Sequence, residues 1–357
     1  MARVECAVPS VPGAGRDGAR EARARMRMPS RLLVLLLAGV IGLPLAAAEV
    51  PPESLLALMS AALSQQDYQG SFVYEHGGRL DALRVYHAAG QPERERLVGL
   101  TGARSEIVRD GNAITCVRSD GPALLMRDRP GAMLLPLLPE TGRRGATRSY
   151  LVRAAGADRV AGYPARIVEV VPRDRWRYGY RIWLEQDSHL PLRSAMLDAN
   201  GHTLEQFMFV ALQIGATPRD GDLAASSDEG VRALPDERPL PAAPRWTVGD
   251  APPGFFFLRA QRPPGGAADA EHQIYSDGLA TVSVYVEPDA GARAQSGTTW
   301  SRGVLSIHAG QVEGCRVTVV GDVPGAAVER MARSVRPVAT AAARARAKAD
   351  AGAPAQD

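Results

Sequence analysis

The stretch Tyr-Gly-Tyr-Arg-Ile-Trp-Leu-Glu at residues 178–185 decides the fold. Large apolar side chains fill every second position from Tyr178 to Leu184, whereas Arg181 and Trp183 stand between them. A period of two is typical of a β-strand with one buried face. Further strands are predicted nearby, over residues 165–171, 190–198 and 204–213. The turn at residues 199–201, Ala-Asn-Gly, joins the last two as a hairpin.

The residues before this stretch predict a helix followed by more short strands. Leu55, Met59 and Leu63 recur at helical spacing, which indicates a helix over residues 53–67. Strands are predicted over residues 67–74, 83–87, 94–100, 105–109 and 113–118. A run of antiparallel strands with one leading helix predicts an α+β, β-rich domain. Its sheet would be strongly curved around the helix or would form a half-open barrel.

The mature chain divides into two domains by composition. Residues 49–214 form the large N-terminal domain, and residues 215–245 are a Pro-rich linker with few large apolar residues. A smaller α+β C-terminal domain is predicted over residues 246–336. The tail, residues 337–357, is Ala-rich and predicted to be disordered.

The first 48 residues have the pattern of a secretory signal peptide. Arg25, Arg27 and Arg31 precede an apolar run over residues 32–43, and three alanines end at Ala48. We expect export to the periplasm with cleavage near Ala48. An uncleaved N-terminal anchor is the alternative, and the true start codon stays open.

The charge balance argues against binding to nucleic acid. The chain has 42 basic and 39 acidic residues. The leader carries seven arginines and three acidic residues, which leaves 35 basic and 36 acidic residues in the mature chain. A protein that binds phosphate backbones usually has a basic excess.

No pattern in the sequence predicts catalysis, a metal site or a cofactor. The HExxH, GxSxG and GxxxxGK(S/T) motifs are absent, and the six histidines are scattered. Residues 13–18 match GxGxxG as a string, but no strand precedes them, so they do not indicate a dinucleotide site. No catalytic residue, metal ligand or cofactor is therefore assigned. Cys116 and Cys315 lie in two predicted strands about 200 residues apart. They are either two buried thiols or a disulfide, and their redox state stays open.

Two groups of residues are candidates for binding. The first is an Arg-rich, aromatic rim that could hold a partner or a lipid headgroup, or could be a solvated strand face. It consists of Arg173, Arg175, Trp176, Arg177, Tyr178, Tyr180, Arg181 and Trp183. The second is an apolar stretch that could line an acyl-chain cavity or simply cap the core. It consists of Leu124, Leu125, Met126, Met133, Leu134, Leu135, Leu137 and Leu138.

Several stretches together resemble the RseB/MucB family, periplasmic negative regulators of the sigma-E envelope-stress pathway. They are Val160–Ile167, Pro172–Leu184, His189–Ser194, Tyr275–Glu287 and Val319–Pro324. The resemblance covers residues 53–336. It implies an N-terminal domain with a fold like the lipoprotein carriers LolA and LolB, and a smaller C-terminal domain.

The resemblance also implies a function. Such a protein binds the periplasmic domain of a single-pass anti-sigma factor of the RseA/MucA type and shields it from regulated proteolysis. A lipopolysaccharide or other acyl signal would release it by binding one form preferentially. The main alternative is a periplasmic lipid or lipoprotein carrier, and an envelope hydrolase is the third. Whether the chain forms a homodimer stays open.

Overall fold

The structure is a computed structural model that describes residues 50–119, 124–126, 148–226, 232–233, 238–239, 243–263, 266–289 and 297–338. The predicted signal peptide over residues 1–48 and nearly all of the predicted tail lie outside these residues. Of the apolar candidates, Met133, Leu134, Leu135, Leu137 and Leu138 also lie outside them.

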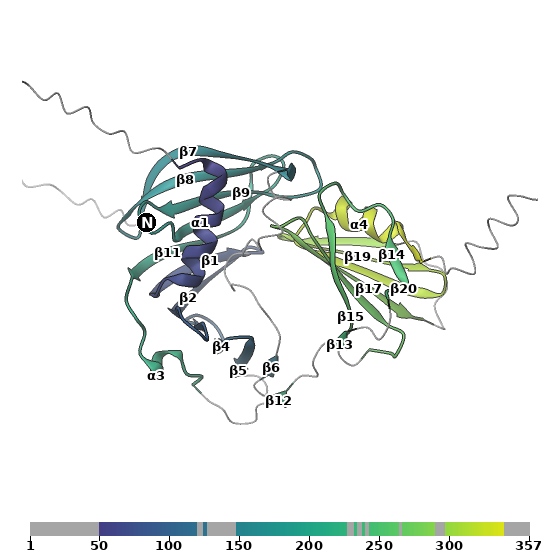
Figure 1. Cartoon of the computed structure of the whole chain (residues 1–357), viewed down its shortest axis with the longest axis horizontal. Coiled ribbons are helices and arrows are strands. Elements are labelled where there is room, and N and C mark those ends of the chain that lie inside the picture. Colours follow the sequence, from purple (N-terminus) through teal and green to yellow (C-terminus); the bar gives the residue numbers. More distant parts are fainter. Residues whose placement is uncertain are drawn as a thin grey trace, which may run out of the picture. The chain divides into compact units, whose positions relative to one another are not determined.

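The first half of the described chain forms one large sheet with the helix α1 (Pro52–Gln65) lying across it (Figure 1). The strands are β1 (Tyr68–His76), β2 (Arg79–Ala88), β3 (Arg94–Gly99), β4 (Ser105–Asp110), β5 (Ala113–Arg118), β6 (Leu124–Met126), β7 (Tyr150–Val160), β8 (Tyr163–Pro172), β9 (Gly179–Glu185), β10 (Pro191–Leu197) and β11 (Thr203–Ile214). With β12 (Arg232–Ala233) at one edge, their order in the sheet is β12-β6-β5-β4-β3-β2-β1-β11-β10-β9-β8-β7. All pairs are antiparallel except the short β12–β6 pair.

The core of this domain lies between α1 and the inner face of the sheet. The helix turns one apolar side inward, and its inward residues are Leu55, Leu56, Met59, Ala62 and Leu63. On the sheet side, Phe72, Phe207 and Phe209 pack edge to face. The alternation predicted for residues 178–185 places Tyr180, Ile182 and Leu184 in this core.

The chain after β11 runs along the strands of the large sheet before it leaves them. The amide of Gly215 donates to the carbonyl of Asp67 at 2.7 Å. In the short helix α3 (Asp220–Leu223), the Asp220 carboxylate pairs with Arg94 at 2.9 Å. Further along, β12 (Arg232–Ala233) pairs with β6, and β13 (Arg238–Pro239) joins the second sheet. Two short strands of the predicted linker are thus paired with the sheets.

The second half forms a smaller sheet covered by one helix, α4 (Gly325–Arg333), which packs against β18, β19 and β20. The strand order is β13-β15-β16-β17-β20-β19-β18. The strands are β15 (Phe256–Arg262), β16 (Glu271–Ser276), β17 (Thr281–Pro288), β18 (Thr298–Arg302), β19 (Leu305–Val312) and β20 (Cys315–Gly321). A separate pair joins β14 (Trp246–Val248) to β21 (Val335–Pro337).

The predicted fold class is confirmed: a large curved antiparallel sheet on a helix, followed by a smaller α+β sheet domain. Two of the longer strands, β7 and β18, have few buried residues. Most of β7 is exposed and carries no alternating apolar pattern, and all five residues of β18 are exposed. Cys116 and Cys315 are free thiols on different sheets.

The packing of α1 predicts very different costs for two leucines on the same helix. Leu56 is 3% exposed and Leu58 is 37% exposed. Leu56→Ala should lower the free energy of unfolding by about 2–5 kcal/mol, because it leaves a cavity under the sheet. Leu58→Ala, the matched control, should cost less than about 1 kcal/mol. Urea unfolding of the mature protein measures both, and equal costs would show that α1 does not pack as described.

Candidate functional site

The turn between β8 and β9 is built around the carboxylate of Asp174. One carboxylate oxygen accepts the backbone N–H of Trp176 at 3.0 Å and the Nε of Arg177 at 3.0 Å. The other accepts Nη2 of Arg177 at 3.1 Å. An Asp that bonds its own backbone two residues on fixes a tight turn. The turn therefore aims the Arg177 guanidinium in one direction, away from solvent.

Arg177 meets a carboxylate from the other sheet. Its Nη1 donates to Oδ2 of Asp277 at 2.6 Å, and the hydroxyl of Tyr150 donates to the same oxygen at 3.1 Å. The side chains of Arg177 and Asp277 are both fully buried. Asp277 lies in the turn between β16 and β17, where its Oδ1 accepts the amides of Leu279 and Ala280. Both oxygens of this buried carboxylate are therefore satisfied, as buried charge requires.

Apolar side chains cross between the two cores around this ion pair. Leu279, in the β16–β17 turn, is 6% exposed and belongs to the core of the large domain, against which Val304 of the β18–β19 turn also packs. In return, Trp176 packs against the core of the small domain. We call this contact, made by Trp176, Arg177, Tyr150, Asp277, Leu279 and Val304, the seam.

Arginine side chains cover the indole of Trp176 from both domains. The guanidinium of Arg175 lies 4.5 Å from the ring centroid, and that of Arg330 on α4 lies 4.8 Å from it. Arginine stacks well on indole because the ring face is electron-rich. Burial raises the pKa of Tyr150 well above its ordinary value, so this phenol stays protonated and can donate to Asp277.

A second carboxylate, that of Asp322, lies beside the seam in surroundings that disfavour its charged form. Burial raises the pKa of Asp322 from 3.8 to about 6, against backbone hydrogen bonds that include one from the amide of Thr281 at 3.0 Å. Asp277 and Glu205 add negative charge nearby, and they raise the pKa further. Since a raised carboxyl pKa means that the charged form is disfavoured, Asp322 destabilises the folded protein at neutral pH.

A pocket of about 480 Å³ adjoins the seam on the Arg-rich side of β8 and β9. Glu169 accepts hydrogen bonds from Arg181 and Arg153 there, and these bonds, led by that of Arg181, lower the pKa of Glu169. Arg173 and Arg175 line the same pocket, are exposed, and have no carboxylate partner among the described residues. Two guanidinium groups without carboxylate partners beside a pocket suit an anionic group.

A second hollow, of about 540 Å³, lies between the start of α1 and strands β7 and β8. Its lining is apolar apart from Arg166, and Val50, Leu55 and Ile167 contribute to it. Arg166 has no ion-pair partner in the described part of the chain. Apolar walls beside an unpaired cation fit an amphiphile with an anionic head.

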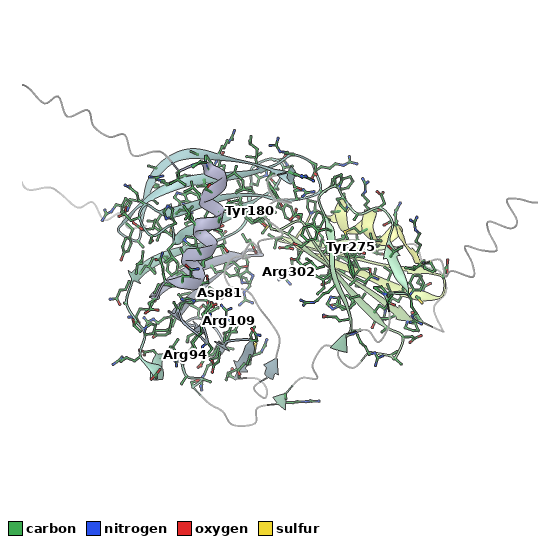
Figure 2. All side chains as sticks on the ribbon, in the orientation of Figure 1. Asp81, Arg94, Arg109, Tyr180, Tyr275 and Arg302 are labelled. Atoms are coloured by element: carbon green, nitrogen blue, oxygen red, sulfur yellow. The ribbon has the colours of Figure 1, made fainter. Side chains whose placement is uncertain are left out.

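The charged residues of a further cluster, in or next to β2, β3 and β4, bond mainly to one another. Arg109, labelled in Figure 2, donates to Glu93 at 2.8 Å and to the buried Glu95 at 2.9 Å. His87 is fully buried, and its ring nitrogens lie 2.8 Å from the carbonyl of Gln66 and 3.1 Å from Glu93. Burial raises the pKa of Glu95. Because these groups bond one another between neighbouring strands, the cluster has a structural role.

The structure separates the predicted rim into exposed and buried members. Arg173, Arg175 and Arg181 are exposed at the pocket. Arg177, Tyr180 (labelled in Figure 2) and Trp183 are buried, so their side chains offer no open surface. Trp176 and Tyr178 are half-buried. Of the predicted apolar group, Leu124, Leu125 and Met126 form β6, and the other five residues lie outside the described chain.

The partners of Arg177 were not predicted from the sequence. The Asp277-Gly278 pair has the composition of a turn, and turns are usually solvated. The signal that could have found the seam is the apolar Leu279 directly after that turn, where a polar residue would be expected. No feature of the sequence around Tyr150 indicated its contact with Asp277.

Comparison with known proteins identifies the family. The protein-family model described as the MucB/RseB N-terminal domain matches residues 51–227. The family model described as the MucB/RseB C-terminal domain matches residues 241–336. The chain is 35% identical to the sigma factor AlgU regulatory protein MucB of Pseudomonas aeruginosa, over 88% of this chain and 99% of that protein. The chain belongs to the MucB/RseB family.

Other members agree with this assignment. The sigma-E factor regulatory protein RseB of Escherichia coli K12 is 28% identical over 79% of this chain and 90% of that protein. A solved complex of Pseudomonas aeruginosa MucA and MucB aligns with a TM-score of 0.66 at 33% identity. That alignment covers 81% of this chain and 99% of the solved one. In the described part of this family member, no helix is long and apolar enough to cross a membrane.

The raised pKa of Asp322 predicts a substitution that stabilises the protein. Between about pH 4 and pH 6 the folded protein binds more protons at this site than the unfolded chain, so stability falls as pH rises. Asp322→Asn keeps an oxygen for the Thr281 amide and removes the charge. It should raise the free energy of unfolding by about 1–3 kcal/mol at pH 7.5 and leave it unchanged below pH 4.

Thermal or urea unfolding of Asp322→Asn and the parent protein at both pH values measures this difference. Asp269→Asn is a control, because Asp269 is an exposed carboxylate of the same domain. A loss of stability for Asp322→Asn at pH 7.5 would contradict the account of this site.

Proposed function

We propose that this chain binds the periplasmic part of a single-pass anti-sigma factor and thereby represses an envelope-stress sigma factor. The observation that carries the proposal is a solved complex of a relative. MucB in complex with MucA(peri) aligns with this chain at a TM-score of 0.65 and 31% identity, over 81% of this chain and all of that one. Both domains of this chain are included in that match.

The mechanism is protection by occupancy. An extended segment held on a folded protein cannot enter a protease active site, so the bound anti-sigma factor survives and keeps its sigma factor inactive. The chain acts from the periplasm after removal of a signal peptide near Ala48. Repression then depends on the affinity of one protein for one segment, with no chemical step.

Release follows from a lipid that binds another form of the protein better. The hollow between α1, β7 and β8 suits an acyl chain, with Arg166 near an anionic head. The pocket with Arg173 and Arg175 suits a phosphate-bearing headgroup such as that of lipopolysaccharide. A ligand shifts the equilibrium only by its difference in affinity for the two forms. These two sites are where that difference would arise.

The protection itself is the first expected outcome. Mature protein starting at Glu49, added to the periplasmic segment of the anti-sigma factor from the same genome, should block its cleavage by the site-one protease. Lipopolysaccharide should restore cleavage. Gel analysis of the cleavage time course measures both effects. An absence of binding at high micromolar concentration, with retention of an acyl ligand, would favour a lipid carrier instead.

The two candidate lipid sites can be told apart by variants. Arg173→Gln combined with Arg175→Gln should weaken the release by lipopolysaccharide at least about tenfold, because each removed guanidinium takes away a charge-assisted hydrogen bond. Arg166→Gln should weaken binding of a fluorescent fatty acid in the same way. Arg316→Gln, which removes an exposed arginine of the small domain, is the control. Unchanged lipid responses in all three variants would remove both sites from the mechanism.

A further inference from the structure

The contacts of the seam come from three turns and from Tyr150, the first residue of β7. In the large domain, the β8–β9 turn supplies Trp176 and Arg177. In the small domain, the turns after β16 and β18 supply Asp277, Leu279 and Val304. Arg302, labelled in Figure 2, ends β18 just before Val304. Turns can separate without disturbing the ladders of either sheet.

The charges at the seam favour two discrete states. When the domains are docked, Arg177 and Asp277 are fully buried and fully bonded. When the domains are apart, water can hydrate both groups. A half-open seam would leave a buried charge without its partner, which costs several kcal/mol. The ion pair therefore makes docking all-or-none.

Solved structures of a relative align with this chain to different degrees. A crystal structure of MucB aligns at a TM-score of 0.57, at 31% identity. The two complexes of MucB with MucA align at 0.65 and 0.66. This chain thus aligns better with the two complexes than with that structure of MucB.

We propose that the Arg177–Asp277 ion pair is a reversible latch, and that the docked form it closes is the form that holds the partner segment. The second part rests on the function proposed above. With the latch open, the two domains remain folded, Leu279 and Val304 leave the core of the large domain, and the grip on the partner is lost. The latch thus sets how much of the protein is competent to bind.

The cysteines of the chain provide a direct measurement of docking. Cys116 on β5 and Cys315 on β20 place one thiol on each sheet. Spin labels on these two residues of the mature protein report the distance between the domains by double electron–electron resonance. The affinity for the anti-sigma segment is measured on the same samples by fluorescence anisotropy.

Two variants open the latch by different means. Asp277→Asn removes the charge and keeps an oxygen for the Leu279 and Ala280 amides. Val304→Asp places a charge against the large-domain core only when the domains dock, so it spares the fold of the separated domains. Glu287→Gln is the matched control, because it removes a partly exposed carboxylate of the same sheet, paired with Arg316.

We expect a single narrow distance for the parent protein and Glu287→Gln, and a broad, longer distribution for Asp277→Asn and Val304→Asp. The open variants should bind the segment at least tenfold more weakly, with near-native circular dichroism. A narrow distance in both latch variants would overturn the latch. Open variants that bind the segment as tightly as the parent would overturn the second part of the proposal, that the docked form holds the partner segment. If the parent itself fails to bind, the proposed function fails, and the distances still decide whether the latch exists.

Discussion

The carboxylate of Asp277 is the constraint on which the arrangement of this protein depends. It receives a guanidinium and a phenol from the large domain while its other oxygen caps its own turn. Burial of this carboxylate without these donors would cost more free energy than the other contacts of the seam provide. The ion pair therefore contributes little to the free energy of docking. Its contribution is specificity, because it fixes which turns meet and in which orientation. The burial of Leu279, Val304 and Trp176 supplies the attraction.

The same loop serves the seam and the pocket beside β8 and β9. Arg173, Asp174 and Arg175 line the pocket, and Asp174 also holds Arg177 in place. A ligand in this pocket would touch the residue that orients Arg177. Under the proposed function, this turn would connect the proposed lipid signal to the docking of the domains.

The sequence predicted the parts of the fold that follow from local periodicity. The strand over residues 178–185 and the helix near residues 53–67 were found because their apolar spacing matches the period of their element. Exposed strands such as β18 carry no such period and were missed. For the site, Arg173, Arg175 and Arg181 were predicted because arginines beside aromatics are common binding residues, and the structure places them, exposed, at a pocket; their role in binding stays a prediction. The burial of Arg177 was not foreseen, since its partner Asp277 is 100 residues away and pairing across domains leaves no local pattern.

The most direct test of this account is a double-mutant cycle at Arg177 and Asp277. The mature protein, Arg177→Met, Asp277→Asn and the double variant would be compared by urea unfolding at pH 7.5. If the two side chains bond each other in a closed seam, the stability losses of the two single variants should sum to more than the loss of the double variant. The difference, which is the coupling energy, should be about 1–3 kcal/mol. Losses that add to within about 0.5 kcal/mol would show that the two residues do not interact, and would contradict the account.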